Sequence, residues 1–232
     1  MSTTDKSLSL NSPWSIGEEK YGQIHKILSS QRVERVIEFG SGISTIRLSL
    51  DFPKAKITSI EHDKDFYGET LKLLAQHQIK NTRVLHCPLK HVRIGLRSYL
   101  TYDLDVNLLE GDIDFTLIDG PVESQTLRGR EAPLYMIFPL LRIGGLVALD
   151  DYHRNSAKAV VKNWLSSYPG NIQVFRDYIN FIVLQKCGEQ QRPGYLGLRV
   201  MLDNWSTNLK LVLRHIRTRL GGFWEKLVNG GR

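Results

Sequence analysis

The sequence has few cysteines, no long apolar run and no internal repeat. Its two cysteines, Cys87 and Cys187, are 100 residues apart and form neither a metal-ligand spacing nor a disulfide framework, which favours a reducing compartment. No uninterrupted apolar stretch reaches the roughly 18 residues that span a bilayer, and residues 1–14 lack the apolar core of a signal peptide. These features predict a cytoplasmic protein, with peripheral attachment to a membrane left open.

Charge is distributed unevenly along the 232 residues. The formal net charge is +7, and residues 192–232 supply +6 of it through eight basic and two acidic residues. The preceding part of the chain therefore carries only +1 and gives no sign of a nucleic-acid-binding surface. With 41% apolar residues, a chain of this length buries about 70% of its unfolded surface, so it needs neither a disulfide nor a metal to fold.

Short β-branched segments alternate with segments of helical periodicity between residues 15 and 186. We predict strands at residues 33–38, 56–61, 82–87, 113–119, 144–151, 171–178 and 179–186, and helices at residues 15–30, 44–51, 65–79, 131–141 and 156–168. Ser15 and Glu18 have capping-box spacing at the first helix, and Pro139 should kink or end the fourth.

This alternation predicts a Rossmann-like, doubly wound α/β fold, with a mainly parallel seven-stranded sheet and helices on both faces. The last two strands form a tight hairpin, which places one antiparallel strand in the sheet. We expect a disordered N-terminus at residues 1–14, the folded domain at residues 15–187 and a long irregular connection at residues 88–112. Residues 188–232 are predicted to be a linker and a basic amphipathic helix. Three roles are open for that helix: packing on its own domain, contact in a homodimer, or attachment to an anionic membrane.

Acidic residues gather where the predicted strands end, which is the edge at which parallel α/β sheets bind ligands. The first strand runs into Glu38-Phe39-Gly40-Ser41-Gly42, and Ser44 and Thr45 can cap the following helix. Glu61 ends the second strand, where a carboxylate can accept both hydroxyls of a ribose. A structural turn and a solvated acid are the alternatives. Because residue 45 is not a third glycine, pyrophosphate binding is disfavoured.

The sequence resembles the class I S-adenosylmethionine-dependent methyltransferases over about residues 15–187. VIEFGSG and ITSIEHD look like the first two motifs of that superfamily, and DFTLIDG and LLRIGGLVALDD look like those at its fourth and fifth strands. The resemblance implies S-adenosylmethionine as cofactor, with Glu38 facing its methionine end and Glu61 on its ribose. The implied cofactor-binding residues are Glu38, Gly40, Ser41, Gly42, Ser44, Glu61, His62, Cys87 and Asp119. Cys87-Pro88 departs from the many members that have an acid near the adenine amino group.

Three carboxylates end two neighbouring predicted strands, Asp119 the fourth and Asp150 and Asp151 the fifth. Converging carboxylates repel one another unless they are protonated or bridged by a cation, and oxygen ligands suit Mg²⁺. The pattern is similar to that of metal-dependent O-methyltransferases acting on catechols or sugar hydroxyls, which implies Mg²⁺ at Asp119, Asp150 and Asp151. Alternatively, Asp150 caps the next helix and Asp151 is solvated.

Asp119 and Asp150 are predicted to be catalytic, together with His153, which is either a general base or an exposed surface histidine. Three arginines flank the site, either as solvated residues or as a clamp for a substrate carboxylate or phosphate: Arg128, Arg130 and Arg154. Tyr99 and Tyr102 either form a lid over the site or pack residues 88–112 onto the domain.

The predicted function is methyl transfer to a hydroxyl of a small-molecule substrate. One alternative is a nucleic-acid methyltransferase that holds phosphates with its basic tail. Against it, Asp119 is followed by Gly-Pro-Val-Glu, whereas enzymes that methylate base amines typically have a Pro-Pro-aromatic run there. The other alternative is a non-catalytic binding module whose tail docks on a membrane or a partner.

Overall fold

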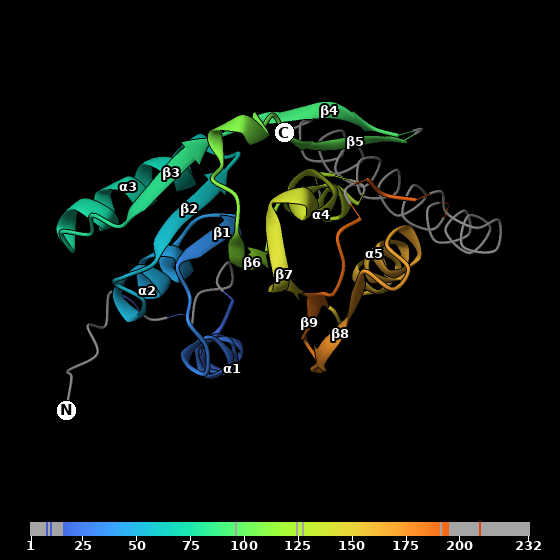
Figure 1. Ribbon diagram of the computed structural model, residues 1–232. Coiled ribbons are helices and arrows are strands. Elements are labelled where there is room, and N and C mark those ends of the chain that lie inside the picture. The colour runs from blue at the N-terminus through green and yellow to red at the C-terminus, as the bar shows by residue number, and fades with distance from the viewer. Residues whose placement is uncertain are drawn as a thin grey trace, which may run out of the picture.

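The computed structural model describes residues 8, 10, 16–95, 97–123, 125–126, 128–190, 192–194 and 209. A seven-stranded sheet with the order β3-β2-β1-β6-β7-β9-β8 forms its centre (Figure 1). Its strands are β1 (Arg35–Phe39), β2 (Lys56–Glu61), β3 (Thr82–His86), β6 (Ile113–Ile118), β7 (Leu141–Asp150), β8 (Ile172–Asp177) and β9 (Phe181–Lys186). Five strands are parallel, and β9 runs antiparallel to both its neighbours, as the sequence predicts.

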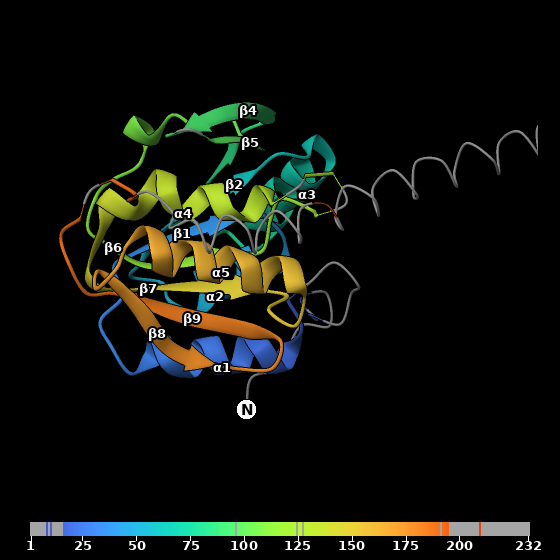
Figure 2. The ribbon, with the colours of Figure 1, turned by 90° about the vertical axis from the view of Figure 1, so that its right-hand side faces the viewer.

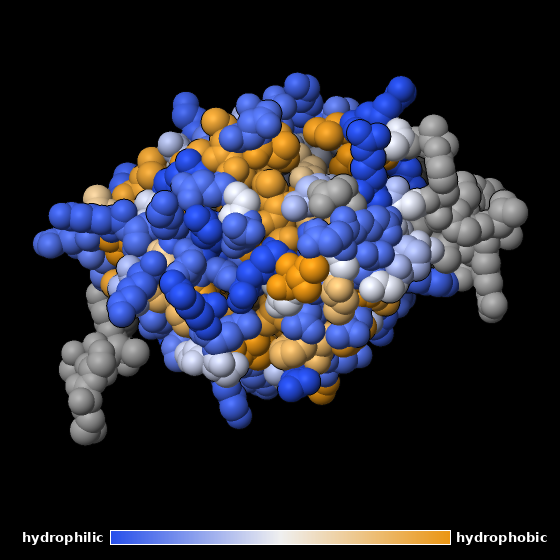
Figure 3. Space-filling view, viewed as in Figure 1, coloured by the Kyte–Doolittle hydropathy of each residue, from blue (hydrophilic) through white to orange (hydrophobic). Residues whose placement is uncertain are grey.

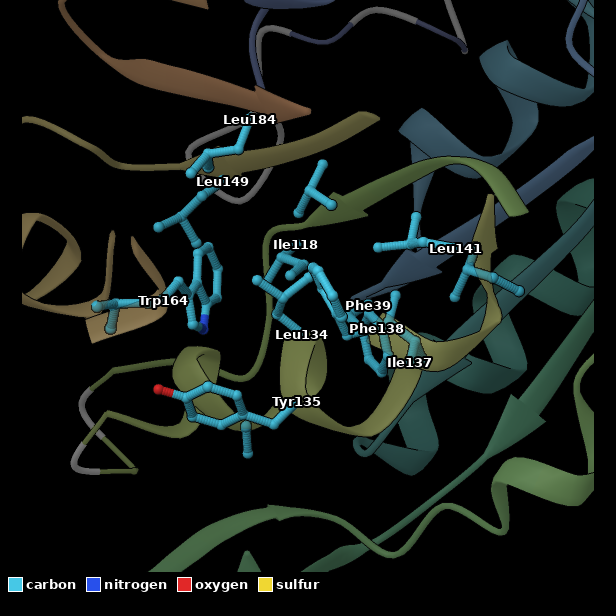
Figure 4. Packing of buried hydrophobic residues seen from close by; sticks show 14 of the residues in the cluster. Phe39, Ile118, Leu134, Tyr135, Ile137, Phe138, Leu141, Leu149, Trp164 and Leu184 are labelled. Atoms are coloured by element: carbon cyan, nitrogen blue, oxygen red, sulfur yellow. The ribbon is translucent and has the colours of Figure 1, made fainter. Parts of the chain in front are cut away.

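Helices cover both faces of this sheet (Figures 1 and 2). One face carries α1 (Glu18–Ser29), α2 (Ile43–Asp51) and α3 (Lys64–Gln76), and the other carries α4 (Ala132–Ile137) and α5 (Asn155–Ser167). Neighbouring strand residues point to opposite faces, so Val36 joins the cluster that includes α1 and Ile37 joins the cluster that includes α4 and α5. Figure 4 shows the second cluster, in which Trp164 packs near Leu149.

Several element ends differ from the predicted ones. Helix α1 begins at Glu18 with Gly17 at its N-cap, so the predicted capping box does not start it; Ser15 lies outside the described residues. Helix α4 ends at Ile137 and a 3₁₀ turn, η4 (Phe138–Leu140), follows. Pro139 has no N–H to continue an α-helix, which confirms the predicted interruption. Strand β7 then begins at Leu141, three residues before the predicted start.

The prediction of an irregular connection at residues 88–112 is wrong. Strands β4 (Leu89–Ile94) and β5 (Arg97–Tyr102) form an antiparallel hairpin, and a 3₁₀ turn, η2 (Val106–Leu108), follows it. The segment reads as too polar for the core because Lys90 and Arg93 are exposed, whereas Tyr99 and Tyr102 are buried. The hairpin lies beyond the sheet on the side of α4 (Figures 1 and 2). Packing of these tyrosines onto the domain is therefore confirmed.

In the chain, this hairpin comes where the preceding crossovers have a helix, and the described part of the β3–β6 connection contains no α-helix. A groove of about 290 Å³ opens on the uncovered part of the sheet, away from the hairpin, and its lining includes Arg35, Lys56, Lys80 and Arg83. The surface over β1 and β2 is mostly hydrophilic in the same view as Figure 1 (Figure 3). The groove lies where β1, β2 and β3 begin, away from the strand ends that carry the acidic residues.

Most of the predicted terminal segments lie outside the described residues, so the disordered N-terminus and the basic amphipathic helix stay predictions. Leu8 and Leu10 are described and are buried against the domain. Within the described part of the chain, none of the helices combines the length and apolarity needed to cross a membrane.

Candidate functional site

The site lies where the chain order of the parallel strands reverses, between β1 and β6. From β1 the chain proceeds to β2 on one side, while β6 pairs with β1 on the other, and ligands of open α/β sheets bind in the crevice beyond such a point. Here the two backbones are close, because the amides of Asp119 and Gly120 both donate to Phe39 O, at 3.0 and 2.8 Å. Gly40 has φ +100°, and a Cβ on it would lie 3.1 Å from Gly120 N. A glycine is therefore required at residue 40.

Glu38 lies fully buried beneath the glycine turn. Its carboxylate accepts hydrogen bonds from Ser44 at 2.6 Å, Thr45 at 2.5 Å and Ser59 at 2.9 Å. Burial raises the pKa of Glu38 to about 7, although these hydroxyls oppose the shift. Thr45 Oγ1 also accepts from Gly42 N at 3.0 Å, so these contacts fix the turn to the start of α2. The arrangement gives Glu38 a structural role, and its contact with the methionine end of a cofactor stays a prediction.

Glu61 joins the glycine turn to the segment after β2. One carboxylate oxygen accepts from Ser41 N at 2.7 Å, and the other accepts from the amides of His62 and Asp63, each at 2.7 Å. Burial alone would raise the pKa of Glu61, but the hydrogen bonds from His62, Asp63 and Ser41 outweigh it and lower that pKa. A negative charge is therefore held at the end of β2, where the sequence predicts a ribose-binding acid.

Two other predicted cofactor residues flank Glu61. Nδ1 of His62 lies 2.9 Å from Glu61 Oε1; burial favours the neutral ring, but the interaction with Glu61 raises the pKa of His62. Cys87 is buried at the end of β3, and its amide donates to Glu61 O at 2.7 Å. Burial raises the pKa of the Cys87 thiol, so it presents a neutral, weakly polar wall. Their contacts with a cofactor stay predictions.

Tyr102, the last residue of β5, fills the space above the glycine turn. Its ring lies 5.4 Å from that of Phe39 and 5.8 Å from that of His62. A Cβ on Gly120 would come within 2.2 Å of the Tyr102 hydroxyl, so this hydroxyl lies directly over the β6 turn. The hydroxyl is buried and has no hydrogen-bond partner among the described residues. Tyr102 therefore both packs on the domain and lies over the site, so the two alternatives given for it from the sequence do not exclude each other.

The three aspartates come together as predicted. One carboxylate oxygen from each of Asp119, Asp150 and Asp151 lies within 4.8 Å of the others. The side chain of Asp119 is 23% exposed, and its partial desolvation, with the nearby Asp150 and Asp151, raises its pKa to about 7 against the opposing effect of Arg130. Asp119 is therefore matched to proton transfer near neutral pH.

Cations already pair with these carboxylates. Arg130 lies 3.3 Å from Asp119 and 3.0 Å from Asp151, and Lys20 lies 2.5 Å from Asp150. The alternative that Asp150 caps the next helix is wrong, because Arg154 is the N-cap residue of α5 and makes no side-chain cap. Asp151 is not simply solvated either. No local pattern in the sequence points to Lys20, which lies 130 residues from Asp150.

The remaining predicted residues divide into two groups. Arg130 and Arg154 face the acidic cluster, with Arg154 at 3.1 Å from Asp151, whereas Arg128 pairs with Glu131. None of the three is simply a solvated residue, and a clamp on a substrate anion would have to compete with these carboxylates. His153 is exposed in the turn before α5, so its role as a general base stays a prediction.

No protein-family model matches the sequence, and no curated protein does. Solved structures match in fold. The O-methyltransferase TomG from Streptomyces achromogenes, solved with SAM, is 14% identical over 75% of this chain and 82% of its own, with a TM-score of 0.55. A SAM-dependent O-methyltransferase from Thermotoga maritima is 13% identical over 75% and 67%, with a TM-score of 0.52. An rRNA methylase from Streptococcus thermophilus is 14% identical over 72% and 95%, with a TM-score of 0.51. At these identities the likeness concerns the fold alone.

Proposed function

We propose that this chain, whose fold is that of the class I S-adenosylmethionine-dependent methyltransferases, transfers a methyl group to a hydroxyl of a small molecule. The observation that carries the proposal is the pair of acids at the switch point between β1 and β6. The anionic Glu61 lies on one side of the glycine turn, and Asp119, whose pKa is about 7, lies on the other. A ribose-binding acid and a base are thus supplied at the edge where such sheets bind ligands.

Each residue around the switch point would have its own role. Glu61 would accept hydrogen bonds from the ribose hydroxyls, and the glycine turn would let the ligand approach the backbone. Cys87 would line the space beside the adenine ring. When bound, S-adenosylmethionine supplies an electrophilic methyl group on a sulfonium. Asp119 would take the proton of the acceptor hydroxyl, since a carboxylate with a pKa near 7 is about half ionised at neutral pH and is a competent base.

The proposed acceptor is a small molecule, because the described residues after Asp119 lack the Pro-Pro-aromatic run expected of enzymes that methylate base amines. A nucleic-acid acceptor would depend on the basic residues 192–232, and a non-catalytic module would bind a ligand without turnover. A screen with labelled S-adenosylmethionine across phenols, sugars, acidic metabolites and RNA separates these three outcomes.

Cofactor binding is the first test. Isothermal titration of S-adenosylmethionine into the full chain is compared with the same titration into Glu61→Ala, with Glu69→Ala as a control at an exposed acid of α3. We expect Glu61→Ala to weaken binding by about 1–3 kcal/mol, the cost of leaving buried polar partners unsatisfied, and the control to bind normally. An unchanged affinity in Glu61→Ala contradicts the ribose assignment. Absence of binding to the unaltered chain contradicts the proposed function.

A further inference from the structure

We propose that Arg130 is the built-in cation of the Asp119, Asp150 and Asp151 cluster, occupying the place that a divalent metal ion would take. All three nitrogens of its guanidinium group lie near acceptors. One lies 3.0 Å from Asp151 Oδ2 and 3.5 Å from Asp150 O, the second lies 3.3 Å from Asp119 Oδ1, and Nε lies 3.3 Å from Pro121 O. The planar group therefore bridges the ends of β6 and β7, as a guanidinium does between two carboxylates.

Cationic side chains already pair with every carboxylate of the cluster. Lys20 pairs with Asp150, Arg130 pairs with Asp119 and Asp151, and Arg154 lies between Asp151 and Glu123. Magnesium requires near-octahedral oxygen ligands at about 2.0–2.1 Å and keeps several waters. Binding it between these oxygens would expel Arg130 from its partners and leave a largely buried guanidinium without them, which is strongly unfavourable. The side chains as arranged do not fit the predicted Mg²⁺ site.

The backbone fixes Arg130 in this place from both sides. Gly129 packs so closely that a Cβ there would lie 2.3 Å from Thr126 Oγ1. Glu131, on the other side, is fully buried and hydrogen-bonded to Tyr99 at 2.9 Å and Asn163 at 2.9 Å. The turn η3 (Gly129–Glu131) therefore holds the backbone of Arg130 in place, and the Arg130 side chain is only 14% exposed.

Arg130 holds Asp119 and Asp151 together and so acts as a positioning residue for Asp119, the proposed general base. This role in methyl transfer rests on the proposed function. The occupation of the cation site by Arg130 does not rest on that function. The two can be tested separately, since metal binding needs neither S-adenosylmethionine nor a methyl acceptor.

The test measures Mn²⁺ binding to the full chain by electron paramagnetic resonance, in which bound Mn²⁺ loses the sharp signal of the free ion. The unaltered chain is compared with Arg130→Ala and Arg130→Gln, the second variant keeping most of the side-chain volume. Arg142→Ala is the matched control, because Arg142 pairs with Asp114 at 2.5 Å away from the cluster. We expect no stoichiometric Mn²⁺ on the unaltered chain or the control, and one ion on a folded Arg130 variant with at least about tenfold higher affinity. Adding Asp151→Asn to that variant should abolish the gain.

Two results would overturn the proposal. One is stoichiometric Mn²⁺ binding to the unaltered chain that is lost in Asp119→Asn. The other is a folded Arg130→Gln variant that binds no more Mn²⁺ than Arg142→Ala. Once an acceptor is found, methyl transfer by the unaltered chain should survive excess chelator, and Arg130→Lys should retain more kcat than Arg130→Ala at similar KM. Failure to find any acceptor would count against the proposed function and leave the Mn²⁺ result standing.

Discussion

Replacing Glu131 should strongly destabilise the protein. Its fully buried carboxylate accepts hydrogen bonds from five side chains. Tyr99, Tyr135 and Arg97 donate to Oε1 at 2.9, 3.0 and 3.0 Å, whereas Asn163 and Arg128 donate to Oε2. The group thus links β5, η3, α4 and α5 through one negative charge.

The expected magnitude follows from these contacts. Glu131→Ala leaves buried donors and two arginines without their carboxylate, which costs about 3–5 kcal/mol in unfolding free energy. Glu131→Gln keeps the volume, but its amide NH₂ must face donors whichever way it turns, because both oxygens of Glu131 are acceptors. It should therefore cost at least about 2 kcal/mol. Tyr135→Phe removes one donor of five and should cost about 1 kcal/mol.

Urea unfolding followed by far-ultraviolet circular dichroism measures these differences as shifts in midpoint at unchanged slope. Hydrogen exchange should show that β5 loses protection in Glu131→Gln, because Arg97 and Tyr99 attach the hairpin to this carboxylate. If Glu131→Gln is no less stable than Tyr135→Phe, the carboxylate does not hold these elements together and the reasoning is wrong.

Three further outcomes are expected. The pKa of Asp119 is raised to about 7, so the ionised fraction of Asp119 increases with pH around neutrality. The value of kcat/KM for methyl transfer should therefore rise to a plateau with a midpoint near pH 7, and Asp119→Asn should lose this activity. A flat profile between pH 5 and 9 counts against Asp119 as the general base. Gly120→Ala should destabilise the fold by about 1–3 kcal/mol, as its Cβ would lie 2.2 Å from the Tyr102 hydroxyl, and Tyr102→Phe in the same chain should restore most of that loss in urea unfolding. If the basic C-terminal segment lies on membranes, the full chain should sediment with anionic vesicles at low salt and a chain lacking residues 198–232 should not; sedimentation that survives the truncation contradicts the membrane role.

The strands and their acidic ends were predictable because each signal is local. A β-branched run such as residues 33–38 followed by a glycine turn determines both a strand and its end. Parallel pairing then brings Asp119, Asp150 and Asp151 to one edge without knowledge of any side-chain contact.

The basic residues that pair with these acids come from other elements, so no local pattern in the sequence identifies them. Lys20 reaches Asp150 from α1, and Arg130 reaches Asp119 across a turn whose shape depends on buried Glu131. Similarly, the β4–β5 hairpin was missed because its exposed side is polar and its buried residues do not follow a strict alternation: Tyr99 packs on η3 and α4, whereas Tyr102 packs on the glycine turn.

The position of Tyr102 would make binding at the proposed site depend on a conformational equilibrium. If a ligand binds over the glycine turn, as the proposed function requires, it has to displace the fully buried Tyr102 side chain, so only the fraction of molecules with Tyr102 moved aside would be competent to bind. The observed affinity equals the intrinsic affinity multiplied by that fraction, and an open state at 1% would weaken it about 100-fold. The same equilibrium limits the association rate, which should become independent of ligand concentration once opening is slower than encounter. A chain in which Glu131 no longer anchors the hairpin would open more often, and could therefore bind its ligand faster while being less stable.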